Sequence, residues 1–341
     1  MSICKMTKTI LLLSLSAIMF SCTNDTEEDN SILNVDFKYE VDIDEIKLSY
    51  NSNDIDGDLL TYEWSTESEL VKLVNVSDVS TYFELSESNQ EQNIDITLTV
   101  SDVESENSIT KTITVPKFTE TRKIGLGAQV THEKSNDVEY KWYYDQAKTG
   151  KYAGVNCGPT TVTMAIKWAN KNFSDTPEDA RSKYRSEGGW WYTSDIISYL
   201  NMKNISNYAI HLSSINKVRN ELDEGNIVII CLDMYYISNQ KKANWHVDKF
   251  YTTNTKDWGH FILAKGYKVV DGKVFYEVYD PNGYGRTYND GSNKGEGRYY
   301  RAEDLDKATN IWWDNAIVVT RNKTKTKKGI NPATIVHQKG R

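Results

Sequence analysis

Apolar and polar residues alternate in short runs between residues 32 and 117, and turn-forming residues separate the runs. A period of two is typical of strands that bury one face. The runs that fit this pattern lie at residues 35–43, 46–52, 59–65, 94–102 and 108–116. Because the region lacks a window with helical periodicity, we expect an all-β sandwich over residues 32–117.

Helical and strand patterns are mixed from residue 138 to residue 320. Apolar residues recur at helical spacing after Cys157, which predicts a helix that ends near Asn172. Further helices are expected from a cap at Thr193 or Ser194, and from a cap at Ser213 or Ser214 to Gly225. Apolar runs predict strands at residues 226–233, 259–267, 273–280 and 315–320. Helices followed by an antiparallel sheet make an α+β domain, and residues 118–137 are expected to be a linker that ends in a strand.

The first residues have the pattern of a bacterial export signal. Lys5 and Lys8 precede an apolar run that is too short for a membrane-spanning helix, so residues 1–21 are expected to be a signal peptide. Cys22 follows at the position where bacterial lipoproteins carry their lipid, and residues 22–31 form an acidic tether. The sequence therefore predicts a lipid-anchored protein of the bacterial cell envelope, on the outer-membrane surface. The alternative is an ordinary secretory signal with an unmodified cysteine.

This prediction leaves few cysteines in the mature protein. Cys4 leaves with the signal peptide and Cys22 carries the lipid, so Cys157 and Cys231 are the cysteines that remain. Two cysteines provide no disulfide framework, and an unpaired thiol outside the cytoplasm requires an explanation.

Charge is distributed unevenly along the chain. The formal net charge is −8, but residues 23–117 contain 23 acidic and 5 basic residues, whereas the tail at residues 321–341 contains 7 basic residues and no acidic one. We interpret the tail as a solvated segment rather than a surface for nucleic acid or membrane, because the rest of the second half is close to neutral.

An acidic cluster in the first half invites a calcium interpretation. Asp54, Asp56 and Asp58 alternate along a turn, but Gly57 does not stand where a calcium loop needs its glycine, and no matching glutamate follows. We favour a solvated turn and leave calcium binding there open. The sequence elsewhere shows no zinc-ligand spacing, and we expect neither a metal nor a cofactor.

Cys157 could be a nucleophile or a small apolar residue at a helix start. It precedes Gly158 and Pro159, and proline is favoured in the first turn of a helix. Free backbone N–H groups and the helix dipole at this position favour a thiolate. Buried structural cysteines are common, however, so the nucleophile hypothesis needs a base.

His260 is the best candidate for that base, because it opens a predicted strand. The other histidines, His132, His211, His246 and His337, lie in predicted linker, turn, loop and tail segments. A three-residue hairpin loop at residues 270–272 would pair Lys265 with Glu277 and place Asp280 on the same face as His260. A two-residue loop would put Asp280 on the other face. The charge pair favours the first register.

Cysteine, histidine and an acid that orients the imidazole make a set for acyl transfer. The side chain of Gln146, upstream of the cysteine, could hold the oxyanion beside the Cys157 backbone N–H, although a surface role for Gln146 is the simpler interpretation.

Motifs in a fixed order carry a family resemblance. "YYDQ", "NCGPTTVTMAI", "ELDEGNIVIICLD", "GHFILAKGY" and "YDPN" together resemble the papain-like cysteine peptidases related to double-glycine, bacteriocin-processing leader peptidases, over residues 138–320. The resemblance implies that Cys157 is the nucleophile, His260 the general base, Asp280 its orienter and Gln146 the oxyanion residue. The Trp258-Gly259 pair before the histidine and a long loop before it depart from the family pattern.

Residues 32–117 in turn resemble PKD-like and other immunoglobulin-like modules of bacterial surface proteins, in which a tryptophan such as Trp64 packs between the sheets. The acidic first half is then a spacer that carries the second half away from the membrane.

Several aromatic residues are candidates for a substrate cleft. Trp190, Trp191 and Trp258, with Asn282, could form its walls, although paired aromatic residues more often pack in a core. Cys231 is expected to be buried in a strand.

The sequence thus predicts a surface-anchored cysteine peptidase that acts on a peptide or protein through a thioester. The alternatives are an amidase or transglutaminase-like acyl transferase on the same fold, and a surface protein that binds without catalysis.

Overall fold

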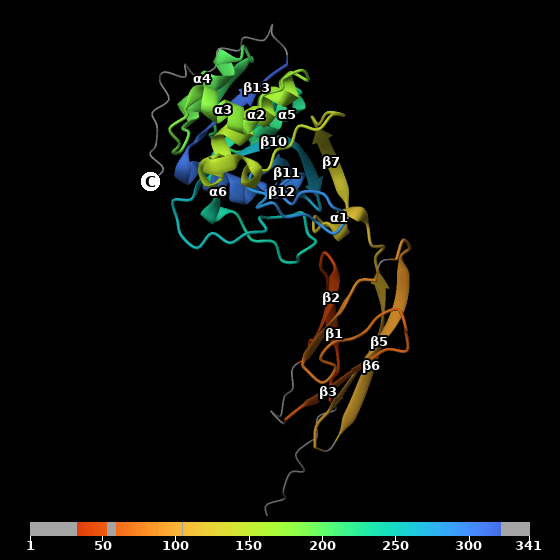
Figure 1. The fold of residues 1–341 in the computed structure, drawn as a ribbon. Coiled ribbons are helices and arrows are strands. Elements are labelled where there is room, and N and C mark those ends of the chain that lie inside the picture. Colours follow the sequence, from red (N-terminus) through yellow and green to blue (C-terminus); the bar gives the residue numbers. More distant parts are fainter. Residues whose placement is uncertain (1–32, 53–58, 87, 104, 322–341) are drawn as a thin grey trace, which may run out of the picture.

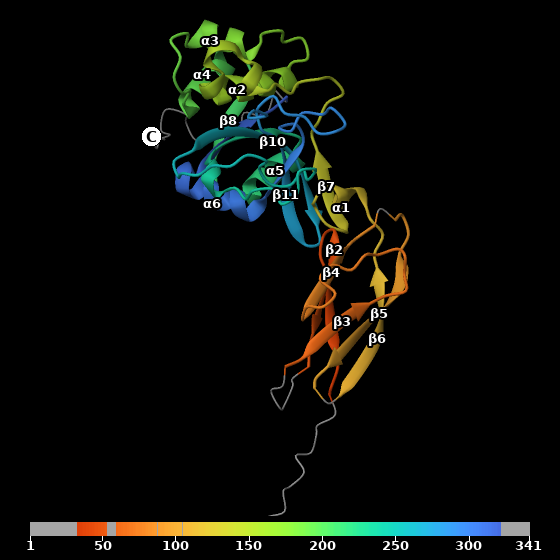
Figure 2. The same cartoon turned by 60° about the horizontal axis from the view of Figure 1, so that its bottom comes forward.

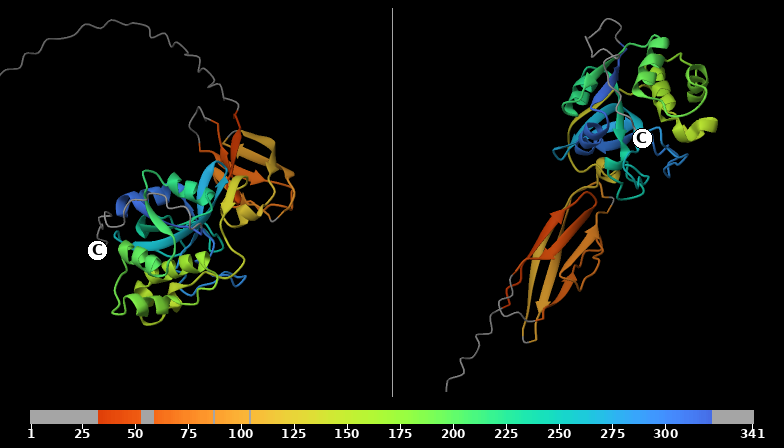
Figure 3. Two further views of the ribbon diagram at one scale, coloured as in Figure 1. Left: turned by 90° about the horizontal axis from the view of Figure 1, so that it is seen from above. Right: turned by 90° about the vertical axis from the view of Figure 1, so that its left-hand side faces the viewer.

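The computed structural model describes residues 33–52, 59–86, 88–103 and 105–321. Its β-strands β1–β6 form one unit, and the elements from α1 onward form a second unit placed at the end of the first (Figure 1). The right-hand view in Figure 3 shows the same end-to-end arrangement. Within the described residues, no helix is long and apolar enough to cross a membrane. The signal peptide, Cys22, the acidic tether, the Asp54–Asp58 cluster and the tail beyond Arg321 lie outside the described residues.

The first unit consists of two antiparallel three-stranded sheets. One contains β1 (Phe37–Val41), β2 (Glu45–Tyr50) and β4 (Ser80–Glu84), and the other contains β3 (Thr61–Ser65), β5 (Gln92–Ser101) and β6 (Glu106–Val115). Inward-facing residues of both sheets share one core. Trp64 lies in this core, its ring centroid 5.2 Å from that of Phe37. Strand β4 was not expected, because only Thr81 and Phe83 in its short run face inward.

The second unit is built on one antiparallel sheet. Its strands are β7 (Val130–Ser135), β8 (Asn207–His211), β9 (Ile227–Asp233), β10 (Gly259–Val270), β11 (Lys273–Tyr279), β12 (Arg298–Arg301) and β13 (Asn315–Val319). The order is β12-β11-β10-β9-β13-β8, and β7 pairs with the far half of β10. β9 is buried on both faces, which explains its uninterrupted apolar sequence.

Helices cover both faces of this sheet (Figure 2). They are α2 (Cys157–Ala169), α3 (Pro177–Tyr184) and α4 (Thr193–Met202) on one face, and α5 (Asn216–Asp223) and α6 (Ala302–Trp312) on the other. Alternate residues of β9 accordingly belong to two cores: Ile229 packs with the first group, and Ile230 with the second. The prediction of helices first and strands afterwards is wrong in detail, because α5 and α6 alternate with strands.

Two predicted helix caps also lie elsewhere. The cap of α4 is Tyr192, whose N–H donates to Asp195, and the cap of α5 is Ile215, whose N–H donates to Asp306. Neither residue is a usual capping type, so capping preferences pointed to the nearby serines and threonines instead.

The segment predicted as a linker is folded. Helix α1 (Glu120–Lys123) is followed by β7, which belongs to the large sheet, so the second unit begins before residue 138. Arg122 Nη1 donates to the carbonyls of Asp42 at 2.8 Å and Ile43 at 2.7 Å. Lys242 in the long loop pairs with Asp44 at 2.5 Å. The two units therefore touch through polar contacts at the end of the first unit.

The β10–β11 hairpin differs from its predicted register. Val270 pairs with Lys273 across a two-residue Asp271-Gly272 turn, in which both residues have positive φ. Asp-Gly is a strong signal for this turn, and the three-residue loop was wrong. A bulge between Ala264 and Gly266 then shifts the pairing by one residue, so the pairs from Ala264 back toward His260 have the predicted register.

The bulge predicts a sensitive position. A Cβ atom on Gly266 would lie 2.4 Å from the Lys134 carbonyl oxygen of β7, and backbone cannot move aside easily. We expect Gly266→Ala to lower the free energy of unfolding by about 1–3 kcal/mol. Gly154→Ala is the matched control, because a Cβ there meets nothing within 4 Å. Chemical denaturation of the two full-length variants checks this, and equal stabilities would contradict the role given to the bulge.

Candidate active site

Cys157 is the first residue of α2, and its side chain is buried. Pro159 fits the first turn because it needs no backbone donor there. Asn156, the preceding residue, donates from its side-chain amide to the carbonyl of Thr149 at 3.1 Å and to its hydroxyl at 3.0 Å. The N–H groups of Cys157 and Gly158 lie in the first helical turn, where no carbonyl of the helix can accept them, and they favour an anion at this end.

His260 stands on β10 directly after a tightly held corner. The Asp233 carboxylate accepts hydrogen bonds from the backbone N–H groups of Asp257 at 2.9 Å and Trp258 at 3.0 Å. At Gly259 a Cβ would lie 2.2 Å from the Trp312 ring, so only glycine allows this approach. These contacts fix where β10 begins, and therefore the direction of the imidazole.

The elements that carry Cys157 and His260 pack against each other. Thr161, one turn along α2, donates to the Phe261 carbonyl of β10 at 3.2 Å. The Cys157 thiol lies near enough to the imidazole to contribute to the raised pKa of His260.

Asp280 follows β11 and is completely buried. Its Oδ1 lies 2.8 Å from His260 Nε2 and accepts the Asn282 backbone N–H at 2.8 Å. Its Oδ2 accepts the hydroxyl groups of Tyr251 at 2.8 Å and Tyr300 at 2.5 Å. The carboxylate is thus fixed by four donors, and Nε2 of the imidazole is occupied, which leaves Nδ1 for Cys157.

The electrostatics of the buried pair favour its charged form. Burial alone would lower the pKa of His260, but the Asp280 charge and the hydrogen bonds of Asp280 and Cys157 raise it to about 10. Burial opposes ionisation of Asp280 too, yet the His260 charge and the hydrogen bonds hold its pKa below the ordinary 3.8. At neutral pH the pair is therefore an imidazolium and a carboxylate.

Gln146 lies beside this cluster. Its backbone N–H donates to the carbonyl of Pro281, next to Asp280, at 2.7 Å, and its carbonyl accepts the Thr149 hydroxyl at 2.6 Å. Thr149 in turn holds Asn156, so hydrogen bonds connect Gln146 to the residue before Cys157. The Gln146 side chain is buried, and its Oε1 has no hydrogen-bond partner among the described residues.

A cavity of about 410 Å³ opens at the cysteine and the histidine. The residues that border it include Cys157, His260, Trp190, Trp191, Trp258 and Trp312. The predicted wall residues Trp190, Trp191 and Trp258 therefore do lie at one cavity. Asn282 is not among the residues that border it, and its backbone N–H donates to Asp280 Oδ1, so its place in a cleft stays a prediction.

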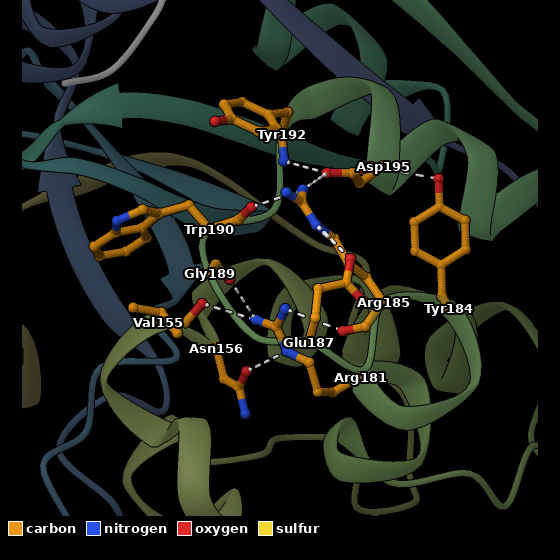
Figure 4. Close-up of polar contacts among 10 residues, drawn as sticks. All are labelled: Val155, Asn156, Arg181, Tyr184, Arg185, Glu187, Gly189, Trp190, Tyr192 and Asp195. Atoms are coloured by element: carbon orange, nitrogen blue, oxygen red, sulfur yellow. Dashed lines mark hydrogen bonds and ion pairs between the residues drawn. The ribbon is translucent and has the colours of Figure 1, made fainter.

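Arg181 on α3 and Arg185 at the C-terminal end of α3 hold the loop that carries Trp190 (Figure 4). Arg181 donates to the Gly189 carbonyl at 2.9 Å, to the Val155 carbonyl at 3.2 Å and to Asn156 Oδ1 at 2.9 Å. One buried guanidinium therefore connects the cavity wall to the segment that precedes Cys157.

Arg185 holds the other side of this loop. It donates to the Trp190 carbonyl at 3.0 Å and pairs with Asp195 at 2.9 Å, and Asp195 also accepts the Tyr192 N–H at 2.8 Å (Figure 4). The wall is thus fixed at Gly189, Trp190 and Tyr192 rather than free to move.

The remaining thiol and imidazoles have other environments. Cys231 is buried in β9, as expected, and burial raises the pKa of its thiol, although its side chain also borders the cavity. His246 stacks on Tyr288 with ring centroids 4.1 Å apart, and His211 is exposed beside Asp314.

Sequence reasoning missed Arg181, Tyr251, Tyr300 and Trp312. The Trp312-Trp313 pair repeats the Trp190-Trp191 pattern and could have been recognised. Nothing in the sequence distinguished the two tyrosines, because one lies in the long loop and the other in a strand that was not expected.

Comparison with known proteins relates the second unit to a known family. The family model "Peptidase_C39 like family" matches residues 137–307, just over half of the chain. No curated protein matches the chain. Solved structures that resemble it include a candidate C39-like peptidase from Bacillus anthracis, 12% identical with a TM-score of 0.38, where the match covers 56% of this chain and 99% of that one. Another is a nucleoside hydrolase-related protein from Saccharophagus degradans, 24% identical with a TM-score of 0.19, where it covers 22% and 20%. At these TM-scores, neither likeness bears on the chemistry of the site.

Proposed function

The chain belongs to the Peptidase_C39 like family, and from this premise we propose that it hydrolyses peptide bonds through Cys157, His260 and Asp280. The observation that carries the proposal is the buried His260–Asp280 pair, 2.8 Å apart, beside a thiol at a helix N-terminus. A pair used only for structure would not need its imidazole directed at a cysteine in a cavity.

The first step is attack by the Cys157 thiolate on the carbonyl carbon of the scissile bond. Negative charge then develops on the carbonyl oxygen, and the Cys157 backbone N–H at the start of α2 can donate to it. We assign the second donor to the side-chain amide of Gln146, because its backbone is fixed to both Pro281 and Thr149. The Cys157 N–H is held by the helix, so this donor needs no reorganisation when the substrate binds.

The second step breaks the C–N bond. The His260 imidazolium gives its Nδ1 proton to the departing amine, which leaves a thioester on Cys157 and a neutral imidazole. The neutral imidazole then removes a proton from water, the hydroxide adds to the thioester, and the carboxylic acid product leaves as the thiolate and imidazolium re-form. Asp280 holds the ring in one orientation throughout and stabilises its charged form.

Incubation of the full-length chain with a complex protein mixture tests this function. We expect new protein N-termini to accumulate with the wild type and to be absent with Cys157→Ala. Release of ammonia without new N-termini would favour an amidase, and cross-linked products would favour an acyl transferase. Intact proteins held by both forms of the chain would favour the binding-only alternative.

We also propose that Cys22 carries a lipid that anchors the chain to the outer-membrane surface, with the first unit, an immunoglobulin-like domain, as the spacer. The support is the export-signal pattern, the acidic tether and the position of Trp64 between two antiparallel sheets. Metabolic labelling with an alkyne fatty acid tests the anchor: label that persists in Cys22→Ser would exclude it.

A further inference from the structure

The cavity beside Cys157 has unusual walls. Much of its border is aromatic, and it includes Trp190, Tyr192, Trp258 and Trp312. Its volume of about 410 Å³ is within the range of about 300–1,000 Å³ that is typical of ligand pockets. Cys157 therefore borders a space far larger than a small side chain needs.

Part of this aromatic surface is exposed. Trp190 is 51% exposed, Tyr192 44% and Trp258 37%, whereas Trp142 and Trp168 in the adjoining core are 2% and 1% exposed. Large apolar side chains clustered around a cavity leave apolar surface in water, which is typical of a binding site. A partner that covered these rings would gain from burying them.

The charges at the cavity narrow the class of partner. Besides His260, the charged side chain at its border is the Asp257 carboxylate, and no lysine or arginine borders it in the described part of the chain. Apart from His260 and the start of α2, which the proposed reaction uses, no cationic group of the described residues there attracts an acidic group. Flat aromatic walls favour a ring, through stacked or edge-to-face contacts.

The walls are positioned before anything binds. Arg181 and Arg185 hold the carbonyls of Gly189 and Trp190, and Figure 4 shows the Trp190 ring directed away from both arginines. Because Arg181 also holds Asn156, the distance between this wall and Cys157 is fixed. A preorganised wall loses little conformational entropy on binding.

We propose that this cavity binds a bulky aromatic side chain of the substrate, close to the scissile bond, and so selects peptides that contain one. The inference rests on the proposed peptidase function for its substrate, but aromatic binding at the cavity can be measured without catalysis. Small residues beside the scissile bond would leave the rings exposed and the cavity filled with water.

Two thiol reagents that differ in one ring test the cavity directly. Iodoacetamide and iodoacetanilide react with the full-length chain, and mass spectrometry follows modification of the peptide that contains Cys157. Rates are divided by those with glutathione, which corrects for intrinsic reactivity. We expect the aryl reagent to react with Cys157 about 10-fold faster than this correction predicts. A corrected ratio near one would overturn the proposal.

Variants locate the effect. Trp190→Ala together with Trp258→Ala should abolish the preference, and Gly154→Phe should reduce it, because Gly154 borders the cavity and a Cβ there meets no atom. Tyr39→Ala is the matched control, since Tyr39 is an aromatic residue 43% exposed on β1 of the other unit. A preference that survives the double variant would contradict the assignment to this cavity.

The map of new N-termini separates this inference from the proposed function. We expect an aromatic residue to be enriched at one fixed position within about three residues of the cleaved bond, with kcat/KM for such peptides on the order of 100-fold above glycine analogues. Cleavage without this enrichment, or with lysine or arginine enriched instead, would overturn the inference and leave the peptidase intact. An aryl preference at Cys157 without any cleavage would support the aromatic cavity and contradict the peptidase function.

Discussion

Cys157→Ala is expected to lower peptide hydrolysis on the order of 10⁵-fold or more, the size of effect that loss of a nucleophile has in other hydrolases. The substitution removes the sulfur and leaves the Cys157 backbone N–H, so the residual rate reports binding and the oxyanion donors alone. Because the change removes one buried atom, the free energy of unfolding should fall by only about 1 kcal/mol. Steady-state kinetics and chemical denaturation of the full-length variant check both statements.

Cys157→Ser is the matched control for shape, since it keeps a side chain of similar size with a far weaker nucleophile. We expect it to be nearly as inactive as the alanine variant and as stable as the wild type. An alanine variant that keeps more than about 1% of the activity would rule out a thioester on Cys157.

Asp280→Asn is expected to reduce kcat/KM by about 10²- to 10⁴-fold at neutral pH and to change its pH profile. The pKa of His260 is raised to about 10 because the Asp280 charge and the hydrogen bonds outweigh burial. In the wild type, the imidazolium that protonates the leaving amine should persist until the pH rises through about 10, and activity should then fall. Without the carboxylate, burial dominates, and this fall should move below the ordinary histidine pKa of 6.5.

The shifted pKa values of His260 and Asp280 also make the stability of the fold depend on pH. The raised pKa of His260 stabilises the fold at acidic and neutral pH, and this contribution is lost as the pH rises through about 10. The lowered pKa of Asp280 contributes above its ordinary 3.8 and is lost as the pH falls below that value.

Tyr300→Phe is the control for Asp280→Asn, because it removes one donor to the carboxylate and keeps the charge. It should cost activity only about 10-fold and leave the alkaline limb near pH 10. An Asp280→Asn profile with its alkaline limb still at the wild-type pH would show that Asp280 does not set the charge of His260.

The start of α2 was predictable because Gly158-Pro159 is a local signal. A cysteine there, a helix of about the observed length and an antiparallel sheet after it all follow from spacing and turn chemistry. Local signals depend on a few neighbouring residues, and no distant contact opposes them here.

The contact between His260 and Asp280 was predicted through an incorrect turn. The two-residue Asp271-Gly272 turn alone would have placed Asp280 on the other face, and the bulge before Gly266 reverses that shift. The bulge depends on β7, which packs its Lys134 carbonyl against Gly266 from a segment more than a hundred residues away. A distant strand of this kind leaves no pattern in the hairpin itself.

The other residues that complete the site also come from distant parts of the sequence. Tyr251 lies in the long loop, Tyr300 on β12 and Arg181 on α3, and each reaches the site only when the whole unit folds. Their spacing in the sequence has no period, so pattern and propensity could not connect them to Cys157 or Asp280.

The most direct measurement for the central claim compares two thiols within one molecule. The folded full-length chain is treated with iodoacetamide between pH 5 and pH 9, and mass spectrometry follows Cys157 and Cys231 separately. Cys231 is the internal reference, because burial raises the pKa of its thiol. We predict that Cys157 reacts at least about 100-fold faster at pH 6, and that Asp280→Asn removes most of this difference. Equal rates at the two cysteines, or a difference that Asp280→Asn leaves unchanged, would contradict the account.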